Sequence, residues 1–426
     1  MTSSTHINPS RASNFLASLI QQYVAANPRS ASENERACRV MPAGNTRAVF
    51  VYQPFPLVMV AGSGCYLTSL DGIVYLDFVS EYFAGMFGHS HPAIKQALEE
   101  ATTMGFNLGA PSSKEIELAE SIISRFPSMD MVQFCTSGTE ANTLAIAVGL
   151  NYSKRKKVLV FENGYHGNTL SFKTPNALRL PHEFVLAPYN DIAGTQKLLQ
   201  PDVGVIIVEP MQGAGGMVPA SYDFLLFLRK QATKFRAVLI FDEVVTARTH
   251  YHGLQGYHNI IPDMTTIGKF YGGGLPFGAY GGRREIMNTL DSRSINSLHH
   301  SGTWHNNIFT MSAGLAAVNL LSTENIDKAN KLGQQLREGL DVIFNASRPD
   351  TVIVRGFGSL VGVHFMGPDS NTLRDAFYFF LLTRKIYIGH RGFLCLSIVH
   401  EKKHVRALLE AAKEFCRAAL LLKPTL

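Results

Sequence analysis

The sequence predicts an α/β protein whose main sheet is mostly parallel and covered by helices on both faces. Three apolar runs carry this prediction: Lys157–Phe161, Gly204–Val208 and Ala237–Phe241. Each run is apolar on both faces and is followed by polar or glycine-rich residues, which is typical of buried parallel strands. Ligands of such sheets bind beyond the carboxyl ends of the strands. The acidic residues at those ends are Glu162, Glu209 and Asp242.

The two ends of the chain predict a second, smaller α+β unit. At the amino end we expect a helix over Asn14–Ala26, with its apolar side chains on one face. At the carboxyl end we expect helices over Met311–Leu321, Lys328–Phe344 and Lys403–Leu422 and strands over Thr351–Val354 and Leu360–Phe365. The expected division is an N-terminal segment, residues 1–75, that packs with the small domain, a large domain, residues 76–318, and a C-terminal small domain, residues 319–426.

Composition excludes several classes of protein. The 426 residues are 46% hydrophobic with a net charge of +6, so the chain can bury a large core and does not resemble a disordered one. The dense basic run Lys154–Lys157 falls between an expected helix and an expected strand, which favours a solvated loop over a nucleic-acid surface. No apolar stretch approaches the ~18 residues of a membrane span. We therefore expect neither nucleic acid nor membrane as a partner.

The cysteines and the first residues bear on the compartment. Five cysteines, an odd number without a C-x-x-C motif, argue against a disulfide scaffold or a zinc site and favour a reducing compartment such as the cytoplasm. The first 32 residues contain no Asp or Glu, which is also typical of a mitochondrial transit peptide. An ordinary N-terminal helix is the preferred interpretation.

Small residues that open a helix form the first candidate site. Thr136-Ser-Gly-Thr-Glu140 precedes an alanine-rich helical run. The free N–H groups and the positive end of a helix dipole attract an anion, and Ser137 and Thr139 add hydroxyl donors. The alternative is a simple N-cap.

Three other residues could complete a cofactor site at the strand ends. Asp242 could hold a cationic ring nitrogen, and Lys269, which precedes a run of three glycines, could form a Schiff base with an aldehyde. Tyr165, past the end of the run Lys157–Phe161, could lie flat on a planar ring. A phosphate cradle, an aromatic platform, a carboxylate and a lysine together are what pyridoxal 5′-phosphate (PLP) requires.

The chain resembles the class III, fold-type I, PLP-dependent aminotransferases from about residue 44 to the C-terminal helix. The motifs that carry the resemblance are FCTSGTEAN (134–142), VFENGYHG (160–167), IIVEPMQGAGG (206–216), LIFDEVVT (239–246), TTIGKFYGGGLPFGAYGGR (265–283) and HSGTWHNN (300–307). The resemblance implies a homodimeric enzyme that uses PLP, takes an amino group from an amino acid and passes it to a 2-keto acid.

The resemblance also implies roles for individual residues. Lys269 would bond to the cofactor aldehyde, and Asp242 would pair with the pyridine nitrogen. The phosphate would be held by Ser137, Gly138 and Thr139, and the ring would lie between Tyr165 and Val244 with His166 beside it. Thr303 would reach the phosphate in the neighbouring subunit, so that the two subunits share their sites.

Two branches of the family compete. The segment 265–283 is similar to glutamate-1-semialdehyde aminomutases, which move an amino group within one molecule. The segments 43–48, 80–89 and 389–397 are similar to aromatic β-amino acid aminotransferases and favour that branch. Within these segments Arg47 is the first candidate for the substrate carboxylate, Arg391 the second, and Tyr82 a further substrate contact.

Some residues depart from the pattern of the β-amino acid branch. Trp304-His305 stands where Phe-Asn is expected, and Val245 where Met or Gln is common. These departures leave the amino donor open, and a class III decarboxylase or racemase with the same cofactor remains an alternative. Glu209 is expected to pair with an arginine when no substrate is bound, and no metal is expected.

Overall fold

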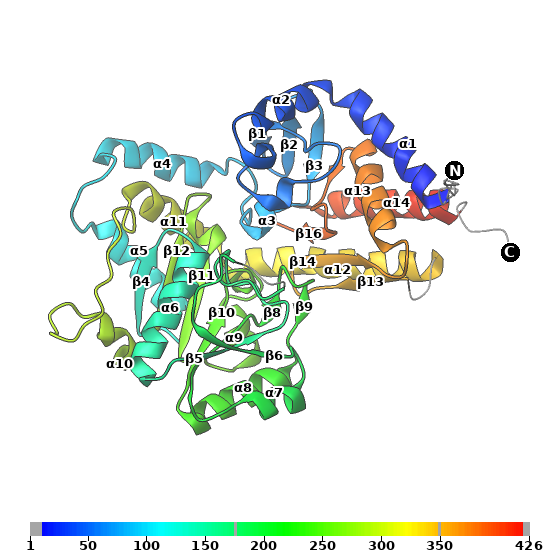
Figure 1. Ribbon diagram of the computed structural model, residues 1–426. Helices are drawn as coiled ribbons and strands as arrows, with labels where there is room; N and C mark the ends of the chain where they lie inside the picture. The colour runs from blue at the N-terminus through cyan, green and yellow to red at the C-terminus, as the bar shows by residue number, and fades with distance from the viewer. Residues whose placement is uncertain (1–10, 174–176, 348–350, 421–426) are drawn as a thin grey trace.

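The computed structural model describes residues 11–173, 177–347 and 351–420 (Figure 1). Its largest sheet has seven strands in the order β4-β12-β11-β10-β7-β5-β6. Strand β12 is antiparallel to both of its neighbours, and β11, β10, β7, β5 and β6 are mutually parallel. The strands are β4 (Met131–Cys135), β5 (Lys157–Phe161), β6 (Glu183–Ala187), β7 (Val203–Val208), β10 (Val238–Asp242), β11 (Met264–Gly268) and β12 (Gly278–Gly282).

The predicted α/β sheet is therefore confirmed, and its apolar runs are β5, β7 and β10. Along β10, Val238 and Ile240 join the core on one face of the sheet, while Leu239 and Phe241 join the core on the other. Helix α6 (Gly138–Ser153) covers the first face and α8 (Tyr222–Phe235) the second. Both faces are thus dry, which explains why the strands are apolar throughout.

Other helices complete the shell of this sheet, and a two-stranded ribbon lies near it. The helices are α4 (Pro92–Met104), α5 (Ser113–Arg125), α7 (Ile192–Leu198), α9 (Gly253–His258), α10 (Arg284–Met287) and α11 (Ile308–Leu320). The ribbon pairs β8 (Met211–Gln212) with β9 (Val218–Pro219).

The two ends of the chain form a second unit with its own core. One sheet has the order β1-β2-β3-β15, and its parallel pair β3–β15 joins residue 77 to residue 387. Helix α1 lies beside α13, and both share a hydrophobic core with α12 and α14 (Figure 1). The boundaries at residues 75 and 318 stay a prediction.

In this unit α1, α12 and α14 correspond to expected helices and β13 and β14 to expected strands, whereas the expected helix over Met311–Leu321 is α11 and packs with α4 and α5. The helices are α1 (Arg11–Ala26), α2 (Pro28–Cys38), α3 (Ser80–Phe83), α12 (Thr323–Ser347), α13 (Ser370–Thr383) and α14 (Lys402–Leu420). The strands are β1 (Met59–Ser63), β2 (Tyr66–Ser69), β3 (Val74–Asp77), β13 (Val352–Arg355), β14 (Leu360–Phe365), β15 (Ile386–Tyr387) and β16 (Phe393–Cys395). Residues 421–422, placed in the last helix by the sequence, lie outside the described residues. None of the described helices is long and apolar enough to cross a membrane.

Candidate active site

A cavity of about 490 Å³ lies where the carboxyl ends of the parallel strands meet the chain-end unit. This volume is typical of small-molecule sites. Most of the site residues expected from the sequence line it, and Ser137 and Thr303 do not. The predicted residues in the lining are Arg47, Tyr82, Gly138, Thr139, Tyr165, His166, Asp242, Val244, Lys269 and Arg391.

Lys269 is the first residue after β11, and its side chain opens into the cavity. Its backbone is left-handed, with φ of 55°, as the chain turns from the strand into a short 3₁₀ turn. Burial lowers the pKa of its amine, although the nearby carboxylates of Asp242 and Glu209 oppose that shift. A lowered pKa increases the share of neutral amine, the form that attacks an aldehyde.

Asp242 ends β10 and is held by neighbours on three sides. Its Oδ2 accepts hydrogen bonds from Asn142 Nδ2 at 2.8 Å and from His166 Nδ1 at 2.7 Å. Its Oδ1 accepts one from the backbone N–H of Val244 at 3.1 Å. Burial disfavours the imidazolium of His166, yet the contact with Asp242 outweighs it and raises the pKa of His166. The carboxylate is thus oriented before any ligand binds.

Asn142 lies at the end of the motif FCTSGTEAN, and the sequence alone predicts no function for it. Its side chain is 1% exposed, donates to Asp242 and to the carbonyl of His166, and accepts a 2.6 Å hydrogen bond from the Thr266 hydroxyl. The signal available in the sequence was a lone amide one turn into an otherwise alanine-rich helix. Thr266, which lies on β11, had no such signal.

The start of α6 lines one end of the cavity. Gly138 and Thr139 are its first residues, and N–H groups at this position have no partner within the helix. Ser137 lies outside the cavity lining, where its hydroxyl accepts a hydrogen bond from Glu140 N at 3.2 Å. Ser137 is therefore the N-cap of α6, and anion binding at Gly138 and Thr139 stays a prediction.

Tyr165 and Val244 both border the cavity. Tyr165 is 39% exposed, its hydroxyl donates to Asn168 at 3.1 Å, and its backbone N–H donates to Glu209 Oε2 at 2.9 Å. Val244 packs against the start of α6, where a Cβ on Gly138 would lie 3.0 Å from it. A flat ligand that enters the cavity meets these two side chains.

The expected pairing of Glu209 with an arginine is wrong for this structure. Its Oε1 accepts a hydrogen bond from Gly213 N at 3.0 Å, and Tyr165 N occupies the other oxygen. Burial, reinforced by the charge of Asp242, raises the pKa of Glu209 to about 7. Both oxygens of the Glu209 carboxyl group accept hydrogen bonds from backbone N–H groups, because Glu209 directly follows β7 and lies next to Tyr165 and Gly213.

Arg47 and Tyr82 form part of the opposite wall. The guanidinium lies 4.7 Å from the ring centroid of Phe50 and 5.2 Å from that of Tyr82. The Tyr82 hydroxyl donates to the carbonyl of Val49 at 3.2 Å. Among the described residues, no carboxylate lies within ion-pair distance of Arg47, so its charge faces the cavity without an acidic partner.

The element that carries Tyr82 is a left-handed turn and not an ordinary helix. The φ angles of Ser80, Glu81, Tyr82 and Phe83 are 43°, 54°, 54° and 79°, which cost free energy in residues with a Cβ. Asp77 accepts hydrogen bonds from the N–H groups of Val79 and Ser80 and contacts His89 Nε2 at 2.9 Å. The tertiary structure imposes this turn, because propensity alone disfavours it.

Arg391 enters the same cavity from the loop before β16, with its guanidinium 5.4 Å from the ring of Phe393. A side hollow of about 220 Å³ lies next to it and shares Arg391 and Lys173 with the main cavity. Among the residues that the structure describes, no carboxylate lies within ion-pair distance of Arg391. The two arginines therefore reach the cavity from different segments of the chain-end unit.

Thr303 is exposed and lies outside the cavity of its own chain. The three residues that depart from the family pattern, Val245, Trp304 and His305, lie in different surroundings. Trp304 is 58% exposed, Val245 lines the cavity, and His305 Nε2 lies 2.9 Å from Glu140 Oε1.

These residues fit PLP on their own chemistry. A lysine with a lowered amine pKa, a carboxylate held in place by His166 and Asn142, and a helix start share one cavity of suitable size. The backbone also comes unusually close there, since a Cβ on Gly167 would lie 2.3 Å from Thr139 Oγ1. Such close approach is typical of sites that hold a phosphate by backbone groups.

Comparison with known proteins agrees with the geometry. The class-III aminotransferase family matches residues 50–410. A β-phenylalanine transaminase of Variovorax paradoxus is 40% identical over 90% of this chain and 91% of its own. A glutamate-1-semialdehyde 2,1-aminomutase of Listeria monocytogenes is 34% identical over 90% of this chain and 96% of its own. The solved structure of a β-phenylalanine aminotransferase from Variovorax paradoxus superposes with a TM-score of 0.93, at 38% identity, covering 96% of this chain and 98% of that one.

The family, the strand-end lysine and the shared architecture lead to one conclusion. The chain belongs to the class-III, fold-type I aminotransferases and is a PLP-dependent transaminase.

Proposed function

We propose that the enzyme takes the amino group of a β-amino acid, with an aromatic β-amino acid as the preferred class, and passes it to a 2-keto acid. The observation that carries this proposal is the pair Arg47 and Arg391, two cations without acidic partners on the wall that faces Lys269. A β-amino acid places its carboxylate one carbon further from the amine than an α-amino acid does. The similarity to a protein named β-phenylalanine transaminase supports this choice.

The bound cofactor supplies an aldehyde that accepts the amino group and a cationic ring that withdraws electrons from the donor carbon. Lys269 Nζ would accept the proton of that carbon as general base and hold it for return as general acid. Asp242 keeps the ring nitrogen protonated, and His166 and Asn142 hold Asp242 in place. Thr139 and the N–H groups at the start of α6 would hold the phosphate, and Tyr165 and Val244, which border the same cavity, would contact the ring.

On the opposite wall, Arg47 binds the donor carboxylate through its planar fork, while Tyr82 packs against its guanidinium. Arg391 serves a second carboxylate, such as that of the keto acid. The distance from arginine to reacting carbon then selects the class of donor.

A donor screen without acceptor tests this proposal. The holoenzyme is mixed with an α-, a β- or an ω-amino acid, and conversion of the cofactor to its pyridoxamine form is followed by absorbance. We expect 3-amino-3-phenylpropanoate to convert the cofactor at least ten times faster than α-phenylalanine. Equal rates would contradict the proposal.

An intramolecular aminomutase is the second candidate, because the chain is also similar to proteins of that name. It would turn over without a separate keto acid, so the rate would not change when 2-oxoglutarate or pyruvate is added. A decarboxylase would release CO2, and a racemase would invert the donor without a keto product.

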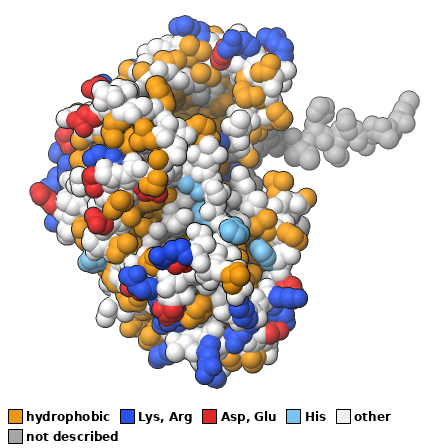
Figure 2. Space-filling view, turned by 90° about the vertical axis from the view of Figure 1, so that its left-hand side faces the viewer, with side chains coloured by type: hydrophobic (Ala, Val, Ile, Leu, Met, Phe, Trp, Pro, Cys, Tyr) orange, Lys and Arg blue, Asp and Glu red, His pale blue; other side chains and the backbone are white. Residues whose placement is uncertain are grey.

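We also propose a homodimer in which Thr303 contacts the partner's cofactor phosphate. Figure 2 views the molecule from the side of α4, α5 and α10 and shows hydrophobic side chains across this face. Large apolar side chains exposed near α4, α5 and Thr303 are Met104 (40%), Phe106 (75%), Leu108 (46%), Ile116 (57%) and Trp304 (58%). Exposed apolar area of this kind marks an interaction surface. Light scattering after size-exclusion chromatography should give about twice the chain mass, and a monomer that retains full activity would contradict the proposal.

We infer a reducing compartment, with the cytoplasm preferred. The thiols of Cys65, Cys135 and Cys395 are buried and form no disulfide. A fusion to a fluorescent protein in the source cell would test the location.

A further inference from the structure

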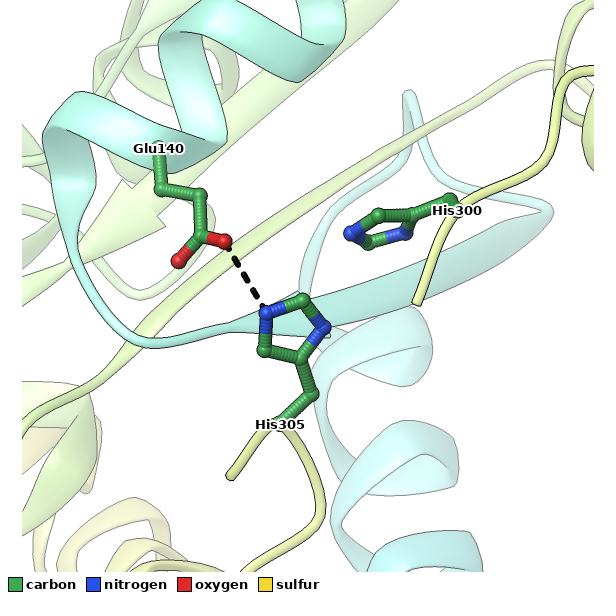
Figure 3. Close-up of side chains that lie close together, drawn as sticks. All are labelled: Glu140, His300 and His305. Atoms are coloured by element: carbon green, nitrogen blue, oxygen red, sulfur yellow. Dashed lines mark hydrogen bonds and ion pairs between the residues drawn. The ribbon is translucent and has the colours of Figure 1, made fainter. Parts of the chain in front are cut away.

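Three side chains outside the proposed mechanism gather beside the start of α6 (Figure 3). Glu140 comes from the first turn of that helix, and His300 and His305 come from the segment that also carries Thr303. One nitrogen or oxygen of each lies within 4.8 Å of the others. Figure 3 shows the two rings turned toward the carboxylate.

Hydrogen bonds orient the Glu140 carboxylate so that one of its oxygens faces the histidines. Its Oε2 accepts from the backbone N–H of Thr136 at 2.8 Å and from the Thr136 hydroxyl at 2.7 Å. Its Oε1 accepts from His305 Nε2 at 2.9 Å. Burial alone would raise the pKa of Glu140, but these hydrogen bonds lower it, so the group is ionised at neutral pH.

His300 supplies an independent observation. Its Nε2 is buried and has no hydrogen-bond partner, which is uncommon for a buried polar atom. Its Nδ1 lies 3.0 Å from the Tyr280 hydroxyl, so the ring is oriented from behind. A neutral imidazole held by its other nitrogen is how histidine binds metals.

We propose that Glu140, His300 and His305 bind one divalent cation of the zinc class. Two imidazoles and a carboxylate are a ligand set that zinc uses, with a fourth position left for water. Bonds of about 2.1 Å place tetrahedral ligand atoms about 3.4 Å apart. From separations of at most 4.8 Å, small side-chain rotations suffice. The proton that joins His305 Nε2 to Glu140 leaves as the cation takes its place.

The backbone accommodates this arrangement. A Cβ on Gly302 would lie 2.0 Å from His305 Nε2, so glycine is what lets the ring lie against its own loop. A cation here would tie Thr303 and Trp304 to the start of α6, which lines one end of the cavity. The inference is independent of which amino donor the enzyme uses.

Zinc titration of the holoenzyme tests the site. Protein stripped with a chelator is titrated with Zn²⁺ against a fluorescent chelator, and bound zinc is counted by elemental analysis after dialysis. We expect one zinc per chain with micromolar affinity or better, and Co²⁺ should give visible d–d absorption of a four-coordinate site. H300Q and H305N should each weaken binding at least tenfold. H299Q, at an exposed neighbouring histidine, is the matched control and should bind zinc as the native chain does.

Three outcomes would overturn the proposal. The first is that the native chain retains no zinc after titration with tens of micromolar Zn²⁺. The second is that H300Q binds zinc as tightly as the native chain. The third is that H299Q loses as much zinc affinity as H300Q. Equal binding would show an adventitious ion on surface histidines only. Circular dichroism and cofactor absorbance of each variant separate lost ligands from lost folding, and the donor screen reports separately on the proposed function.

Discussion

The two walls of the cavity differ in how their side chains are held. On the sheet wall, Asp242 ends a buried strand, Lys269 directly follows one, and His166 and Asn142 form a closed hydrogen-bond network with Asp242. On the chain-end wall, Arg47 and Arg391 come from loops and rest on aromatic rings. With the proposed roles, the difference teaches that the reacting groups are built on the rigid sheet, whereas the groups proposed to recognise the substrate lie on segments that can vary in length and position.

The largest expected effect is on the sheet wall. Lys269→Ala should lower kcat by a factor of about 10³ or more, because the variant lacks the group proposed to move the proton of the donor carbon. The visible absorbance of the covalently linked cofactor should disappear as well. Lys173→Ala, which removes another lysine of the same cavity, is the control and should keep that absorbance. Borohydride reduction that links the cofactor to a lysine other than Lys269 would refute the assignment.

The next effect is on the opposite wall. Arg47→Ala should raise KM for a carboxylated donor roughly 10- to 100-fold, the cost of one charged hydrogen-bond pair, and change a simple amine such as 1-phenylethylamine little. Steady-state kinetics with both donors measure the difference. An equal loss of activity with both donors would show that Arg47 does not bind the donor carboxylate. The proposed division of recognition and chemistry between the two walls would then lose support.

A substitution of Asn142 tests whether the hydrogen-bond network around Asp242 contributes to the reaction rate. Asn142→Ala should lower kcat about tenfold with little change in KM, because Asp242 loses a 2.8 Å donor and Thr266 loses its acceptor. Single-turnover rates and the pH dependence of cofactor absorbance report on the ring nitrogen directly. A change in thermal stability alone, with an unaltered pH profile, would mean that Asn142 is only structural.

The smallest effect concerns the support of the chain-end wall. Hydrogen bonds to Asp77 and Glu81 raise the pKa of His89 to about 9, against burial, from an ordinary value of 6.5. Because the pKa of His89 is higher in the folded state than in the unfolded state, protonated His89 stabilises the folded protein. This stabilisation is fully present below pH 6.5 and is lost as the pH rises toward 9. Such a change in pKa corresponds to about 3 kcal/mol of unfolding free energy, and solvent screening at this partly exposed ring reduces the expected loss over that range to about 2 kcal/mol; His89→Gln should lack this loss. Urea unfolding at several pH values measures it, and parallel curves for both proteins would contradict it.

The sheet wall could be predicted from the sequence because its signals are local. Runs such as Ala237–Phe241 are apolar on both faces, so they indicate buried parallel strands, and the residues at their carboxyl ends must gather at one edge. Asp242, Lys269 and Tyr165 were found in this way before any resemblance was used. Arg47 and Arg391 depended on similar segments in a known family, since isolated arginines between turns carry no periodic signal.

What the sequence determined by itself is the buried strands β5, β7 and β10, the helix start at Ser137–Thr139 and the residue types that a PLP site requires. What only the tertiary structure decided is which side chains satisfy one another across long separations. The carboxyl group of Glu209 accepts hydrogen bonds from backbone N–H groups and not from an arginine. Asn142 donates a hydrogen bond to Asp242, which is 100 residues away in the sequence. The segment Ser80–Phe83 forms a left-handed turn. The physical reason is that strands and caps arise from neighbours along the chain, whereas these partners are chosen by packing, which local propensity does not encode.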